Sequence, residues 1–142
     1  MQKPNYKIRQ TYLLRLPPGE DLLVGLHRVR REHNIQLGVF NVVGSVRNAT
    51  LGHEDQQTGE VRRQILETGL DLVTCNGNIS RQGASYAIRA NAVLCDAQGQ
   101  VAAGELLAAE IHVAEVFIQE LQGAKLVRER DPETGLFLWP VS

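Results

Sequence analysis

Cysteine is scarce in this chain of 142 residues, which contains only Cys75 and Cys95. The two form no C-x-x-C pair and fall within expected strands, which predicts that both are small buried hydrophobic residues. A chain of this length buries roughly 68% of its unfolded surface, so it can hold a core without disulfides or metal. The length fits one domain, and the apolar fraction of 43% argues against a disordered chain.

Neither sign of charge is in excess, because 15 Lys and Arg residues stand against 16 Asp and Glu, a formal net charge of −1. Domains that bind nucleic acid are usually strongly basic, so the composition gives little support for DNA as a partner. The densest basic stretch contains Arg28, Arg30 and Arg31. It falls on an expected helix, and a solvated face is the favoured interpretation.

Long apolar runs are absent as well. No run approaches the 18 or so residues that cross a bilayer. The segment from Met1 to Lys7 is polar and has no apolar core of a secretion signal. We therefore expect no membrane partner and a cytoplasmic location.

The motifs of several enzyme classes are also missing. The glycines form neither G-x-G-x-x-G nor G-x-x-x-x-G-K-[ST], and no serine lies in G-x-S-x-G. The histidines show no H-x-H or H-x-x-x-H spacing; His112 lies near Glu110 and Glu115, but an ordinary hydrogen-bonded histidine is favoured over a metal or acid–base role. Nothing suggests the electropositive setting that would make Cys75 a nucleophile. These absences predict no cofactor and no catalytic residue.

The regular patterns begin with a strand over 7–16, where polar and apolar residues roughly alternate. Pro17-Pro18 ends it, because proline has no backbone N–H for the ladder. A helix is expected from Gly19 to His33. Its apolar stripe has helical spacing and consists of Leu22, Leu23, Leu26 and Val29.

Strand signals dominate the rest of the chain. Further strands are expected at 35–43, 46–52, 61–66, 70–75, 86–95, 100–107 and 125–130, with a loop between Gly77 and Gly83 and turns at 56–59, 96–99 and 131–135. The segment 113–121 fits a buried strand by its β-branched content or a short helix by its Ala, Glu and Leu, and strand is preferred. Short connections favour antiparallel pairing and an α+β fold over a parallel sheet.

Four segments in the same order resemble the plant-and-prokaryote-conserved (PPC) domain family. Residues 70–80 are similar to its E-I-L-S-L-x-G-x-I-S segment, with Asp71 in the acidic position, and residues 96–106 to its D-x-x-G-x-V-x-G-G-H-L segment. Residues 114–118 resemble A-E-V-V-I, and 128–139 match R-x-x-D-x-x-T-G-L-x-x-W. The chain is identified as a stand-alone bacterial member. The resemblance implies a single domain over 1–142, with an antiparallel sheet, flanking helices and a homotrimeric assembly.

Three positions depart from the family pattern. Prokaryotic relatives often carry H-x-H and a further histidine that together resemble a zinc site, where this chain has Arg89, Asn91 and Glu105. Arginine offers no lone pair to a metal, and asparagine is a poor zinc ligand. We therefore predict no zinc here. Arg89 either pairs with Glu105 or binds an anionic ligand; a purely structural pair at a drifted site is the favoured alternative.

Three functions remain open on the sequence. The first is a non-catalytic homotrimeric binding or regulatory module, with a small ligand near the subunit interface. The second is DNA binding, a label often attached to the family; plant relatives contact DNA through a separate AT-hook that this chain lacks. The third is a small-molecule enzyme at a subunit interface. Candidate ligand-binding residues are Asp71, Arg89, Asn91, Glu105 and Glu115.

Overall fold

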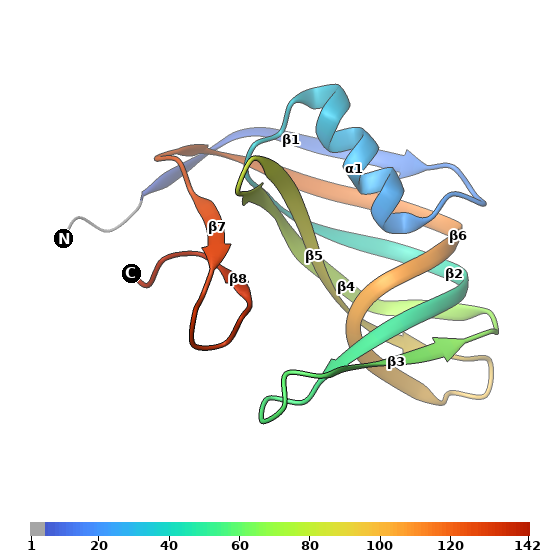
Figure 1. The fold of residues 1–142 in the computed structure, drawn as a ribbon. Helices are drawn as coiled ribbons and strands as arrows, with labels where there is room; N and C mark the ends of the chain where they lie inside the picture. The colour runs from blue at the N-terminus through green and yellow to red at the C-terminus, as the bar shows by residue number, and fades with distance from the viewer. Residues whose placement is uncertain (1–4) are drawn as a thin grey trace.

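The computed structural model describes residues 5–142, and these form eight strands and one helix (Figure 1). The first four residues of the expected polar N-terminal segment lie outside the described residues. In chain order the elements are β1 (Tyr6–Leu16), α1 (Leu22–His33), β2 (Gly38–Glu54), β3 (Val61–Leu66), β4 (Leu70–Gln82), β5 (Ser85–Cys95), β6 (Val101–Gly123), β7 (Val127–Arg130) and β8 (Phe137–Leu138).

Two long strands, β2 and β6, organise the sheet. β2 pairs with both β4 and β6, and β5 pairs with both β4 and β6, so these four strands form a closed circuit of antiparallel pairings. β1 joins one end of β6, and β3 joins the far end of β2. Figure 1 shows both long strands bending through the molecule. The prediction of a mainly antiparallel sheet is confirmed; the pairing of β7 with β4 is parallel.

The helix covers the inner face of the sheet, beside β1 and β6 (Figure 1). Leu22 and Leu26 are fully buried, as the helical spacing predicts. Burying each such side chain stabilises the fold by about 1.5–3 kcal/mol. Asp21 caps the first turn by accepting a hydrogen bond from the Val24 amide, and Asn34 ends the helix at φ 52°.

The expectation of several flanking helices is wrong, because residues 5–142 contain one helix. Segment 113–121 is strand, as preferred, within a β6 that continues unbroken from Val101 to Gly123. Its buried apolar side chains lie between Leu106 and Ile118. Its first residues pair with β5 and its last with β1, so one strand serves two parts of the sheet. The helix has 12 residues, and no helix in the described part of the chain is both long and apolar enough to cross a membrane.

Gly77 was expected to begin a loop, and this prediction is wrong. β4 runs through it to Gln82, and of the two glycines only Gly83 lies in the turn, at φ 57°. A Cβ on Gly77 would overlap the carbonyl oxygen of Arg89 and come within 2.8 Å of Phe40 Cζ. Gly77 therefore permits close strand packing, a role that the sequence pattern does not distinguish from a turn.

The expected solvated basic face is also wrong in part. Arg30 is only 9% exposed, and its guanidinium lies 3.7 Å from the ring centre of Tyr86 on β5. Arg28 is partly exposed and pairs with Glu20 and Glu32 instead. Arg30 thus ties the helix to β5, because a planar guanidinium can stack on an aromatic ring.

Candidate functional site

Three asparagines lie side by side on the outer face of the sheet. Asn41 on β2 is the register partner of Asn76 on β4, and Asn76 is the register partner of Asn91 on β5. Register partners in antiparallel strands place their side chains on the same face. We call Asn41, Asn76 and Asn91 the amide row; all three are exposed.

A second row lies one pleat further along the same strands. Val39 on β2 pairs with Asn78 on β4, and Asn78 pairs with Arg89 on β5. On the other side of Val39 the row continues to Gln119 of β6. The basic residue Arg89 therefore stands at the β5 end of this row, next to the amide row.

The two rows form the floor of a pocket of about 590 Å³. The C-terminal segment adds Arg128 of β7 and Trp139 to its lining, and Figure 1 shows the β7–β8 hairpin beside the β4–β5 ladder. We call this the arginine–amide pocket. Its basic and main amide residues are Asn41, Asn76, Asn78, Arg89, Asn91 and Arg128.

Arg128 is the most constrained residue of the pocket, with 5% of its surface exposed. Its guanidinium donates hydrogen bonds to Ser80 Oγ at 3.0 Å, Asn78 Oδ1 at 2.9 Å and the Phe137 carbonyl at 3.3 Å. It also lies 4.5 Å from the ring centre of Trp139, whose indole N–H donates to Ser80 Oγ. These contacts fix the plane and direction of the guanidinium.

All of these partners of Arg128 are neutral. Within residues 5–142 no carboxylate lies within ion-pair distance of it. Burial lowers the pKa of Arg128, and the positive charge of Arg89 lowers it further. The pocket therefore contains a buried positive charge that no described acidic side chain neutralises, next to a second arginine.

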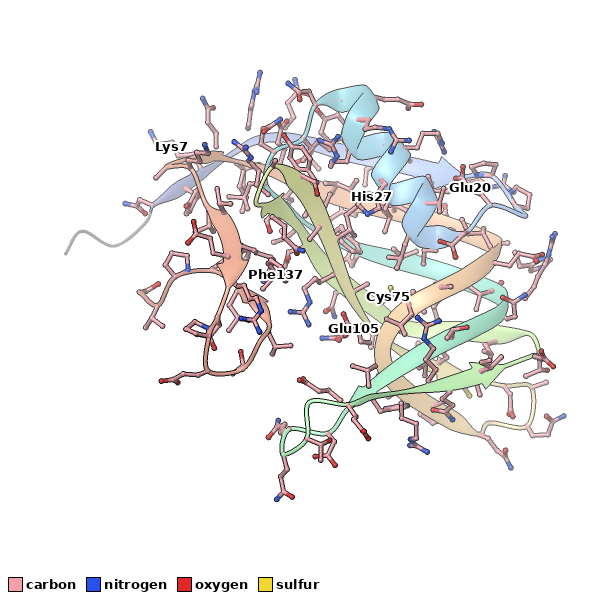
Figure 2. All side chains as sticks on the ribbon, viewed as in Figure 1. Lys7, Glu20, His27, Cys75, Glu105 and Phe137 are labelled. Carbon is pink, nitrogen blue, oxygen red and sulfur yellow. The ribbon has the colours of Figure 1, made fainter. Side chains whose placement is uncertain are left out.

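Arg89 is half-exposed and lies beside Glu105 of β6. The Arg89 Nε and Glu105 Oε1 atoms are 3.6 Å apart, and Glu105 is the register partner of Asn91. Figure 2 labels Glu105 on β6 and Phe137 in the C-terminal hairpin. An ion pair this exposed contributes little to stability. The structure thus brings together three of the five predicted residues, while a ligand-binding role for them stays a prediction.

The other two predicted residues lie elsewhere. Asp71 pairs in register with Ser45 and Cys95 and lines a smaller hollow of about 380 Å³ together with His112. Glu115 lies opposite Arg15 of β1 and lines a separate shallow hollow. Neither is among the lining residues of the arginine–amide pocket.

The side chains at the family's histidine positions do not fit a metal ion. Arg89 carries its own positive charge, Asn91 is a weak donor, and one carboxylate, Glu105, cannot replace three imidazoles. In the described part of the chain no three His, Cys, Asp or Glu side chains gather in a group that could hold a metal. We derive no chemistry through a metal here.

Sequence reasoning missed Asn41, Asn78, Trp139 and the pocket role of Arg128. Asparagine is depleted in strands, but the expected strand ends at 75 and Asn78 falls in the expected loop, so its strand position was not visible from the sequence. Arg128 and Trp139 were noted only as parts of a family motif. Their contact with β4 depends on a parallel pairing between 81–82 and 127–128, which no local pattern reveals.

The two cysteines differ in burial. Cys75 is buried, as predicted, and burial raises the pKa of its thiol to about 11. Cys95 was also expected to be buried but is half-exposed at the end of β5. Because the thiolate is the reactive form, we expect iodoacetamide at pH 8 to label Cys95 and spare Cys75 in the folded protein. Peptide mass spectrometry measures this; labelling of Cys75 as fast as in urea would contradict its burial.

Comparison with known proteins supports the motif-based resemblance. The family model of the Plants and Prokaryotes Conserved (PCC) domain matches residues 4–122. A plant- and prokaryote-conserved protein from Pyrococcus horikoshii is 30% identical, with a TM-score of 0.94 over 100% of this chain and 99% of that one. A metal-containing protein from Archaeoglobus fulgidus is also 30% identical, with a TM-score of 0.92 over 99% of this chain and 100% of that one.

Two further comparisons are more distant or partial. A Bacteroides thetaiotaomicron protein whose name proposes DNA binding has a TM-score of 0.86 at 21% identity over 96% of each chain, a likeness of fold alone. Among curated proteins, the bifunctional protein GlmU of Synechococcus sp. strain JA-2-3B'a(2-13) is 36% identical over 90 residues, 63% of this chain. The match spans only 13% of the length of that relative.

Proposed function

Since the chain belongs to the Plants and Prokaryotes Conserved domain family, we propose that its 142 residues act as one binding module that takes a small anionic ligand in the arginine–amide pocket. The observation that carries the proposal is Arg128, buried and paired only with neutral groups. A buried charge is costly without a counter-charge. An anion placed between Arg128 and Arg89 would supply one.

The lining of the pocket favours binding over catalysis. Among the described residues that line it there is no His, Cys, Asp, Glu, Lys or Tyr. General acid–base catalysis needs a group that gives or takes a proton near neutral pH, and arginine does not. Glu105 is outside this lining; it contacts Arg89 and shares a neighbouring hollow with Asn76 and Asn91. The asparagines offer hydrogen bonds, which orient a ligand without reacting with it.

Titration with inorganic phosphate tests anion binding. A ligand that binds only the folded state stabilises it by about 2.7 kcal/mol at 100 times its Kd. We expect phosphate to raise Tm more than sodium chloride of equal ionic strength does, and Arg89→Gln to lose that difference. Phosphate also stabilises proteins non-specifically, so Arg62→Gln, an exposed arginine on β3, is the matched control and should keep the difference. An equal increase of Tm with phosphate in the native protein and both variants would rule the proposal out.

We further propose that the protein is a homotrimer, as the family resemblance implies. An apolar strip on the outer face of the sheet supports an assembly. Leu13 of β1 is 77% exposed, Val43 of β2 is 67% exposed, and Phe117 of β6 is the register partner of Leu13. Exposed apolar groups that gather on one face are typical of protein interfaces. Because Phe117 also lines the arginine–amide pocket, the ligand would lie near the subunit boundary.

Leu13→Glu tests the assembly. A charge in an apolar contact costs several kcal/mol when it stays unpaired, so we expect the native protein to have three times the 15.7 kDa chain mass and the variant to dissociate. Val24→Glu is the matched control, because Val24 is 57% exposed on the outward side of α1. Native mass spectrometry reports both masses. A native protein of single-chain mass would contradict the proposal.

DNA binding, which the names of some structural relatives propose, has less support. Phosphate contacts dominate affinity for DNA, and a chain of net charge −1 has few lysines and arginines to spare for them. The likeness to those relatives, at 21% identity, concerns the fold. We expect no gel shift with duplex DNA at low ionic strength; a shift that weakens steeply with salt would revive this function.

A further inference from the structure

The three asparagines of the amide row are unfavourable in strands, and contacts within the described part of the chain do not compensate for this. Asparagine is among the residues least favoured in strands. Within residues 5–142 no side-chain hydrogen bond engages Asn41 or Asn91, and Asn76 donates one long bond of 3.4 Å to Thr74 Oγ1. The three amides therefore face the pocket with their donors and acceptors almost entirely available. A ligand with complementary groups would use them.

The chemistry of the row selects neutral, hydroxyl-rich groups. Each carboxamide offers an acceptor oxygen and two N–H donors, and a hydroxyl is likewise both donor and acceptor. A row of three such amides matches several adjacent hydroxyls. The amides themselves carry no charge, and the carboxylate of Glu105, the register partner of Asn91, also accepts hydrogen bonds from hydroxyls. Gln119 adds a further amide at the edge of the pocket.

The dimensions fit a small ring with its substituents. Neighbouring strands are about 4.8 Å apart, so the row from Asn41 to Asn91 spans about 10 Å. The second row is two residues along each strand, about 6.6 Å away. Asn78 in that row accepts from Arg128 and is the register partner of Arg89. The cationic end of the pocket is thus about one ring length from the row.

From these placements, and resting on the anion binding proposed above, we propose that the ligand is a phosphate ester of a polyhydroxylated molecule. The phosphate lies between Arg89 and Arg128, and the hydroxyls lie on the amide row. A sugar phosphate and a nucleotide share this chemistry, since both join a phosphate to a hydroxylated ring. Arginine suits the phosphate because its planar group offers paired N–H donors.

Calorimetric titrations with four probes test the proposal: inorganic phosphate, ribose, ribose 5-phosphate and AMP. We expect ribose 5-phosphate to bind at least about tenfold more tightly than inorganic phosphate, the equivalent of one or two hydrogen bonds. In the double variant Asn76→Ala, Asn91→Ala we expect ribose 5-phosphate to lose its tenfold advantage over inorganic phosphate, measured as the ratio of the two affinities in that variant. Asn48→Ala is the matched control, because Asn48 is an exposed asparagine of β2 outside the pocket.

The outcomes separate this inference from the proposed function. Equal affinity for AMP and ribose 5-phosphate identifies the ligand as a sugar phosphate. Tighter binding of AMP identifies it as a nucleotide. Either result supports the inference. If phosphate binds but ribose 5-phosphate binds no better, the inference is wrong and the anion site stands. If no anion binds, both fail. If the double variant keeps every affinity but changes the mass of the particle in solution, the row serves contact between copies and the inference is overturned.

Discussion

Gly77→Ala is expected to destabilise the protein by roughly 3 kcal/mol or more, the upper range for a group forced into a packed interior. The added Cβ would meet the carbonyl oxygen of Arg89 and the ring of Phe40, so β4 and β5 could not keep their present separation. Backbone cannot move aside as a flexible side chain does. Urea unfolding followed by circular dichroism measures the change, because the midpoint and slope give the free energy of unfolding.

Gly69→Ala is the matched control. Gly69 lies just before β4, and a Cβ there would meet nothing within 4 Å. We expect this variant to be as stable as the native protein or up to about 1 kcal/mol more stable, because alanine narrows the unfolded ensemble. Equal stability of both variants would show that β4 and β5 are not packed at Gly77 as described. Gly77→Ala would also disturb the arginine–amide pocket, because the β4–β5 ladder holds Asn76 beside Asn91.

Arg128→Ala is expected to have the second large effect, on both stability and binding. Three hydrogen bonds and the contact with Trp139 would be lost. Asn78 Oδ1 would have no partner, and Ser80 Oγ would keep only the indole N–H of Trp139. Removing a buried group of this kind typically costs about 2–4 kcal/mol. Anion binding would be lost as well. Urea unfolding and phosphate titration measure the two effects separately.

The same variant should loosen the C-terminal hairpin. β7 pairs with β4 through only two register pairs, and β8 has two residues, so few backbone contacts hold this segment. We expect hydrogen exchange of the amides in 127–139 to accelerate in Arg128→Ala and to stay unchanged in Arg130→Ala, whose side chain is exposed. A native exchange pattern in Arg128→Ala would show that the hairpin is held by something else.

The predictions succeeded where short-range periodicity and burial agree. The stripe containing Leu22 and Leu26 gave the helix, and the alternation in 86–95 gave β5, because each pattern repeats over several turns or pleats. The predictions failed where they rested on a single glycine or a single charged residue. Gly77 is typical of a loop by sequence pattern alone, because the sequence does not show which backbone approaches it. The charge of Arg30 predicts a surface residue, because its ring partner Tyr86 is 56 positions away in the chain.

Only part of the candidate site could be predicted from the sequence. Arg89, Asn91 and Glu105 emerged because they replace expected histidines, and the structure places them on adjacent strands. Arg128 and Trp139 come from beyond the family-matched residues 4–122 and meet β4 through a long-range parallel contact. No local pattern encodes that contact, so the buried charge on which the proposed function rests became visible only in the fold.

Nuclear magnetic resonance of ¹⁵N-labelled protein during titration with inorganic phosphate tests anion binding most directly. The spectrum reports the side-chain N–H groups of arginine, asparagine and tryptophan one by one. We predict saturable shifts at the Nε–H groups of Arg89 and Arg128 and at the indole N–H of Trp139, with Arg62 and Asn48 unmoved. Shifts spread evenly over exposed arginines, or none at Arg128, would contradict an anion site in the arginine–amide pocket.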